Sequence, residues 1–162
     1  MRLPNRKPGK YTFLAVDTTM TPEKLAALKE KLDRLKKVTR PQAMKDTRQY
    51  GENGDFSENA EYQIAKGRLR GLNRQIDELE YQINHAVIIA TPKDADTVQI
   101  GHQVTLQTHT GAVTYQILGS SESNPTAGII SYQSPLGAAL IGHKTGEIVK
   151  INNKEYTISL IK

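Results

Sequence analysis

The sequence of 162 residues contains no cysteine and no tryptophan, and only 6% of its residues are aromatic. Without cysteine the chain has neither disulfides nor thiolate ligands for zinc. So few aromatic side chains suit helices that bury leucine and isoleucine better than one deep core. The four histidines, at positions 85, 102, 109 and 143, are far apart and lack the spacing of a metal site.

Long hydrophobic runs are also missing. The apolar stretch at residues 13–16 follows a basic N-terminus but is too short for the core of a signal peptide. No stretch approaches the roughly 20 apolar residues that cross a membrane as a helix. We therefore expect a cytoplasmic protein without a membrane partner.

Positive charge is in excess only in the first part of the chain, although the formal net charge is +5. Residues 1–20 carry four basic and one acidic residue, residues 21–92 thirteen and eleven, and residues 93–162 five of each. Residues 93–162 carry no net charge, so electrostatics gives no reason to expect that they bind nucleic acid. Pro4, Pro8 and Gly9 predict an irregular basic arm over residues 1–20.

Two series of apolar residues at alternating spacings of three and four predict a helical hairpin over residues 21–90. The first series follows Thr21, a good N-cap, and Pro22, which fits the first turn of a helix. Pro41 interrupts this helix and is expected to kink it. The turn is predicted near residues 51–54, at the end of a stalk about 45 Å long. The heptad seam of the second helix consists of Ala65, Leu69, Leu72, Ile76, Leu79, Ile83 and Ala86.

After Pro92 the apolar pattern changes to a period of two, which predicts strands at residues 98–100, 104–106, 113–117 and 156–160. One short helix fits residues 134–140, with Ser134 as cap and Pro135 at its first position. Residues 93–162 thus form a small domain with an antiparallel sheet. The predicted fold class is α+β.

Two acidic residues at the predicted tip, Asp55 and Glu58, are three residues apart and point the same way on a helical turn. Two convergent carboxylates suit a hard cation such as Mg²⁺. The same pattern is a capping box, in which Asp55 caps the second helix. Spacing alone favours the cap, but the two hypotheses are compatible because a capping carboxylate keeps lone pairs for a cation.

A basic stretch follows the tip and contains Lys66, Arg68, Arg70 and Arg74. These side chains either contact phosphates behind a metal-binding tip or form a solvated helix face. The residues alone leave both interpretations open.

Residues 54–62, Gly-Asp-Phe-Ser-Glu-Asn-Ala-Glu-Tyr, resemble the tip signature of the Gre transcript cleavage factors, GreA and GreB. Arg40-Pro41 and the segment 130–142 resemble further motifs of this family, and the resemblance covers residues 20–162. The first twenty residues have no counterpart in the usual GreA pattern. Phe56 replaces the common Leu or Arg, and Gly51 and Gly67 make this end of the stalk less helical.

The resemblance implies an N-terminal antiparallel coiled coil and a C-terminal domain similar to FK506-binding proteins. It implies a transcription elongation factor whose C-terminal domain docks on the rim of the secondary channel of bacterial RNA polymerase, through Gln133, Ser134 and Pro135. The coiled coil enters this channel, where Asp55 and Glu58 help to hold a Mg²⁺ ion of the polymerase active site. The polymerase then cleaves backtracked RNA near its 3′ end, and Lys66, Arg68 and Arg70 meet the extruded RNA.

On this reading the chain is a monomer that is no enzyme by itself and binds no cofactor tightly when free. An alternative is a protein of the same shape that blocks the channel without stimulating cleavage, although intact acids at both tip positions argue against it. A second alternative is a prolyl isomerase. That activity needs an aromatic pocket, whereas residues 93–162 contain only Tyr115, Tyr132 and Tyr156 as aromatics.

Overall fold

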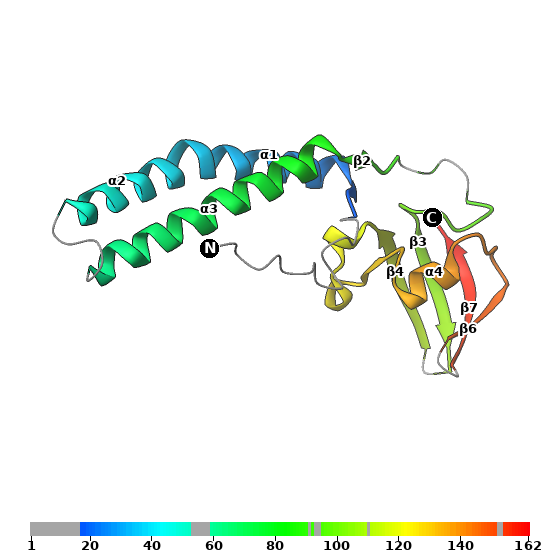
Figure 1. Ribbon diagram of the computed structural model, residues 1–162. Helices are drawn as coiled ribbons and strands as arrows, with labels where there is room; N and C mark the ends of the chain where they lie inside the picture. Colours follow the sequence, from blue (N-terminus) through cyan, green and yellow to red (C-terminus); the bar gives the residue numbers. More distant parts are fainter. Residues whose placement is uncertain (1–16, 53–58, 91, 93–94, 110, 152–153) are drawn as a thin grey trace, which may run out of the picture.

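The chain folds into a long helical hairpin with a small sheet domain at its base, as the computed structural model shows (Figure 1). The structure describes residues 17–52, 59–90, 92, 95–109, 111–151 and 154–162. Helices dominate the first half and strands the second. The predicted α+β class is therefore confirmed.

The first arm of the hairpin consists of α1 (Pro22–Arg34), a π-helical segment η1 (Leu35–Thr39) and α2 (Arg40–Gly51) in succession. Thr21 caps α1 as predicted, because its Oγ1 accepts a hydrogen bond of 3.2 Å from the Lys24 N–H. Pro41 has no N–H, and its ring conflicts with a helical carbonyl four residues earlier. The expected interruption takes the form of η1, whose wider turns directly precede this proline.

The second arm is the single helix α3 (Ala60–Asn84), which lies alongside the first arm (Figure 1). Its seam residues Ala65, Ile76 and Leu79 are buried, as are seam residues of the first arm. The predicted heptad seam is therefore confirmed. Charged residues occupy the outside, where Lys36 forms an ion pair with Glu80 across the two arms.

Gly67 lies inside α3, and a Cβ at this position would meet no atom within 4 Å. We predict that Gly67→Ala raises the free energy of unfolding by about 1 kcal/mol, because alanine loses less backbone entropy in a helix. Chemical denaturation followed by circular dichroism measures the change. Gly71→Ala, in equally open space, should behave alike; a loss of stability in both variants would contradict the prediction.

A short two-stranded parallel sheet closes the base of the hairpin. It pairs β1 (Thr19–Met20) with β2 (Val87–Ile88), and the Met20 side chain is fully buried in the hairpin core. The predicted irregular arm is therefore wrong for its last residues, because the apolar Met20 side chain fills the space between the helix ends. Residues 1–16 lie outside the described part of the chain.

The C-terminal sheet has five strands in the order β5-β4-β3-β7-β6. Its members are β3 (Gln103–Thr108), β4 (Gly111–Leu118), β5 (Ile129–Ser131), β6 (Ile148–Ile151) and β7 (Lys154–Ile161). The sheet is mixed rather than antiparallel, because β4 and β5 run parallel. The chain between them crosses over through the 3₁₀ turns η2 (Ser120–Glu122) and η3 (Pro125–Ala127), which lets β5 run in the direction of β4. Residues 98–100 form no strand, although Val98 is part of the core.

One face of this sheet carries the core of the domain. The predicted alternation holds in the central strand β3, where Val104 and Leu106 are fully buried. The helix α4 (Pro135–Leu140) contributes Leu140 to the same core. In the described part of the chain, no helix is both long and apolar enough to cross a membrane.

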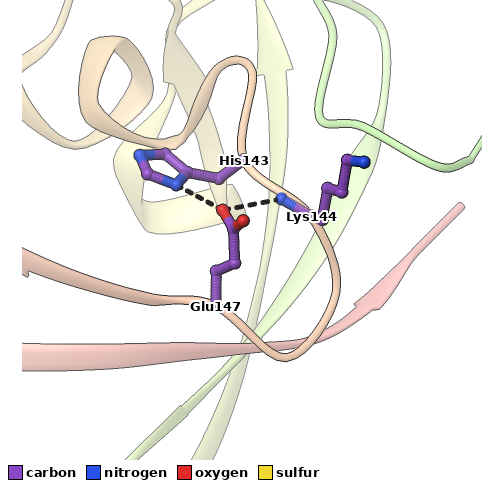
Figure 2. A network of polar contacts seen from close by, with 3 residues as sticks. All are labelled: His143, Lys144 and Glu147. Atoms are coloured by element: carbon purple, nitrogen blue, oxygen red, sulfur yellow. Dashed lines mark hydrogen bonds and ion pairs between the residues drawn. The ribbon is translucent and has the colours of Figure 1, made fainter.

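A polar turn leads from α4 into β6 (Figure 2). The Glu147 carboxylate accepts a hydrogen bond of 3.1 Å from the Lys144 N–H and lies 2.6 Å from His143 Nδ1. The backbone N–H of Lys144, followed by the His143 ring, lowers the pKa of Glu147 below its usual value. These contacts hold the turn at the surface of the domain.

Candidate functional site

The predicted tip acids, Asp55 and Glu58, belong to residues 53–58, which lie outside the described part of the chain. The structure describes both flanks of this segment. On one side α2 ends at Gly51, and the Glu52 carboxylate accepts a hydrogen bond of 3.0 Å from Arg48 Nε. On the other side α3 begins at Ala60. The end of α2 and the start of α3, which flank this segment in the sequence, lie at the end of the hairpin that is remote from the sheet domain (Figure 1).

Asn59 joins the two flanks of the tip. Its Oδ1 accepts a hydrogen bond of 2.9 Å from the Tyr62 N–H, which caps α3. Its Nδ2 donates a hydrogen bond of 2.7 Å to the Tyr50 carbonyl at the end of α2. The hypothesis that Asp55 caps this helix is therefore wrong, because α3 begins later and its N-cap is Asn59. Asparagine is a preferred N-cap, so residue type offered a signal for it.

We predict that Asn59→Ala lowers the free energy of unfolding of the hairpin by about 1 kcal/mol, since it removes the cap of α3. Asn59→Asp is the matched control, because aspartate still caps the helix but cannot donate to the Tyr50 carbonyl. Urea denaturation compares the variants. If Asn59→Ala were as stable as the parent, the cap would not contribute to stability.

The three predicted RNA-contacting residues do not form one continuous patch. Lys66 and Arg70 are one helical turn apart on the same stripe of α3, and the Lys66 ammonium lies 5.7 Å from the centre of the Tyr62 ring. Arg68 is two residues from each and projects from another side of the helix. It lines a cavity of about 150 Å³ between α2 and α3, together with Ala43, Asp46, Tyr50, Glu61, Ile64 and Ala65.

The three predicted docking residues lie together where β5 leads into α4. Ser134 caps α4: its Oγ accepts a hydrogen bond of 3.1 Å from the Gly137 N–H and donates one of 2.7 Å to the Ser131 carbonyl. Pro135 occupies the first turn and is exposed. Gln133 is also exposed, and its Nε2 donates a hydrogen bond of 2.9 Å to the Tyr132 hydroxyl. Ser134 therefore shapes this loop, whereas Gln133 and Pro135 present their side chains at its surface.

Among the residues that the structure describes, no group of three or more His, Asp or Glu side chains is arranged to hold a metal ion. The docking loop is part of the sheet domain, and the basic residues are part of the hairpin. The candidate site thus has two separate parts, one on the hairpin and one on the sheet domain.

Comparison with known proteins connects these two parts to one family. Residues 18–88 match the model of the N-terminal domain of the transcription elongation factors GreA and GreB, and residues 92–162 match the model of their C-terminal domain. The first seventeen residues lie outside both matches. Together the two models span nearly the whole hairpin and the whole sheet domain.

Individual relatives show the same similarity. The chain is 37% identical to transcription elongation factor GreA of Thermomicrobium roseum over 141 residues, which are 86% of this chain and 90% of that protein. It is 39% identical to GreA of Trichlorobacter lovleyi over 150 residues, 88% of this chain and 95% of that protein. Among solved structures it is similar to GreA factor homolog 1 of Thermus thermophilus, with 23% identity, coverage of 90% and 99%, and a TM-score of 0.42. From the domain matches and the identity to these relatives, the chain belongs to the GreA/GreB family of transcription elongation factors.

Proposed function

We propose that this elongation factor rescues backtracked bacterial RNA polymerase by stimulating the polymerase's own cleavage of the transcript near its 3′ end. The observation that carries the proposal is the layout of the chain: the hairpin arms α2 and α3, which flank the two acidic residues in the sequence, meet at the end remote from a globular domain. The arm from Pro22 to Gly51 is about 45 Å long at 1.5 Å per residue. An arm of this length places its tip deep inside a partner while the domain stays at the partner's surface.

In this proposal the C-terminal domain docks at the rim of the secondary channel of the polymerase. The exposed Gln133 and Pro135 side chains support such a contact, because the hydrogen bonds of Ser134 fix the loop that carries them. A preformed loop loses little conformational entropy when it binds. The hairpin then follows the channel toward the active centre.

At the tip, Asp55 and Glu58 supply carboxylate oxygens to a Mg²⁺ ion that is shared with the polymerase. Two carboxylates would suit this hard cation, and the polymerase would supply further ligands. Mg²⁺ bound at this position would supply the Lewis acidity that activates water for RNA hydrolysis. Asn59 joins the end of α2 to the start of α3, the two helix ends that flank these acids in the sequence.

The basic side chains behind the tip contact the extruded RNA. The stripe of Lys66 and Arg70 is exposed and suits the phosphate backbone, which basic residues bind irrespective of base sequence. Arg68 lies on another side of α3, so it contacts a different part of the RNA or of the channel wall.

The test uses a stalled, backtracked polymerase complex with RNA labelled at its 5′ end, incubated with Mg²⁺ in the presence and absence of the protein. We expect shortened transcripts that resume elongation when nucleotides are added, and no cleavage of free RNA by the protein alone. Inhibition of nucleotide addition without cleavage would instead identify a channel-blocking protein.

A further inference from the structure

The base of the hairpin and the sheet domain are joined by two carboxylates that cross the junction in opposite directions. From the hairpin side, Asp17 Oδ2 accepts a hydrogen bond of 2.7 Å from the Ser120 N–H, and its Oδ1 accepts one of 3.3 Å from the Tyr132 hydroxyl. From the domain side, Glu122 Oε2 accepts a hydrogen bond of 2.8 Å from the Thr21 N–H. Glu122 Oε1 also accepts one of 2.6 Å from the Thr21 hydroxyl.

Glu122 binds the N-terminal end of α1, which helps to set the direction of this helix. Thr21 is the N-cap of this helix, and its N–H and hydroxyl both donate to the one carboxylate. The positive end of the helix dipole strengthens the attraction. The sheet domain therefore holds the end of α1 directly.

Asp17, on the hairpin side of the junction, is also held by several hydrogen bonds. Although partial burial opposes its ionisation, hydrogen bonds from Ser120 and Thr19 lower its pKa below the usual value. The Thr19 N–H donates to Asp17 Oδ1 at 3.0 Å, and Thr19 belongs to β1 at the base of the hairpin. The carboxylate thus connects the paired strands of the hairpin base to η2 of the sheet domain.

Beside these carboxylates, the backbones of the hairpin base and the sheet domain are in direct contact. A Cβ built on Gly119 would lie 1.8 Å from the Thr19 carbonyl oxygen, so only glycine permits this approach. Neighbouring residues continue into the docking loop, because Ser120 Oγ lies 2.9 Å from Ser131 Oγ and 3.4 Å from Gln133 Oε1. The Gln133 amide in turn donates to the Tyr132 hydroxyl that contacts Asp17.

We propose that Asp17 and Glu122 form a clasp that fixes the direction of the hairpin relative to the sheet domain, and that Gln133 couples this clasp to the docking loop. Asp17 and Glu122 are positioning residues. Their role in transcript cleavage rests on the function proposed above, whereas their role in orientation does not.

The length of the hairpin makes this role necessary. A rotation of 10° at the base moves the end of a 45 Å arm by about 8 Å. The ligand distances of Mg²⁺ are close to 2 Å, and a misplacement of about 1 Å can lower a reaction rate by about 100-fold. Since about 1 Å at the end of this arm corresponds to a rotation of about 1°, the clasp has to restrict rotation to about this angle for the tip acids to reach a shared ion.

The test measures orientation in the free, full-length protein. Because the chain has no cysteine, spin labels can be attached to cysteines introduced at the exposed positions Gln49 of α2 and Gln107 of β3. Pulsed electron paramagnetic resonance then gives the distribution of distances between them. We expect one narrow distribution for the parent and a broad one for the double variant Asp17→Ala/Glu122→Ala. Each lost carboxylate should raise the population of rotated orientations about tenfold.

Matched controls separate the clasp from general effects of the substitutions. Thr21→Ser keeps both donors to Glu122 and should retain the narrow distribution. Glu155→Ala removes a carboxylate that pairs with Lys150 within the sheet and should also leave it unchanged. Gly119→Ala keeps both carboxylates, but it should shift or broaden the distance distribution, because its Cβ would collide with the Thr19 carbonyl. If the double variant kept the narrow distribution of the parent, the clasp would be disproved.

Cleavage assays at saturating protein test the functional part separately. We expect the double variant to cleave at least tenfold more slowly than the parent while its circular dichroism spectrum is unchanged. A broad distance distribution together with parental cleavage would disprove the coupling to function. If the parent itself stimulated no cleavage, the proposed function would fail, whereas the distance measurement would still decide whether the clasp exists.

Discussion

Replacing Asp55 or Glu58 with alanine is expected to slow the stimulated cleavage of backtracked transcripts about 100-fold. Stabilisation of a metal ion and its water contributes several kcal/mol, and a loss of about 3 kcal/mol corresponds to this factor. Polymerase binding should change little, because the docking loop lies in the other domain. Single-turnover cleavage, measured at saturating protein, separates the rate from the affinity.

Two comparisons make this result specific to the tip acids. Glu52→Ala removes a neighbouring carboxylate that pairs with Arg48, and it should retain most of the activity. Higher Mg²⁺ concentrations should partly restore Asp55→Ala, because mass action compensates for weaker binding of the ion. If neither acid mattered for cleavage, the mechanism proposed here would be wrong, although the chain would remain a member of its family.

The second large effect is expected in the sheet domain, where Gly137→Ala should lower the free energy of unfolding by about 3 kcal/mol. A Cβ at this position would lie 2.1 Å from the Ser131 carbonyl oxygen. That oxygen cannot move aside easily, because it accepts hydrogen bonds from both the N–H and the hydroxyl of Ser134. The backbone of the docking loop therefore has to shift, which should also weaken binding to the polymerase.

Denaturant unfolding of the purified variants measures this loss, and a polymerase binding assay measures the second effect. Gly67→Ala provides the contrast, because the same chemical change in open space is predicted to stabilise the protein. Ala138→Gly, on the exposed side of the same helix, should cost only about 1 kcal/mol. A stable Gly137→Ala variant with parental affinity would show that the loop tolerates the extra methyl group.

The elements that the sequence predicted well depend on contacts between neighbours along the chain. The heptad spacing of Ala65, Ile76 and Leu79 places these side chains on one face of α3 whatever its partner is. Ser134 and Pro135 mark the start of α4 for a similarly local reason, because a cap bonds within its own helical turn. The roles of the candidate tip acids stay a prediction, which rests on their pattern and their place in a family signature.

The features that sequence analysis missed or misplaced depend on residues that are far apart in the chain. The cap of α3 was assigned to Asp55, because the capping pattern fits several positions. The correct position depends on the residue at which the helix begins. The parallel pairing of β4 and β5 follows from a crossover whose direction no local pattern specifies. Met20 was placed in an irregular arm because one apolar residue has no periodicity.

By itself, the sequence determined the hairpin and the fold class, because helix periodicity and residue type are properties of a local segment. Only the tertiary structure decided that Asn59 bridges the two arms and that Asp17 and Glu122 join the two halves. Each of these depends on where distant backbone groups meet. The physical reason is that a carboxylate can accept from any exposed N–H and an amide can also donate to any exposed carbonyl, so the folded chain alone selects the partner.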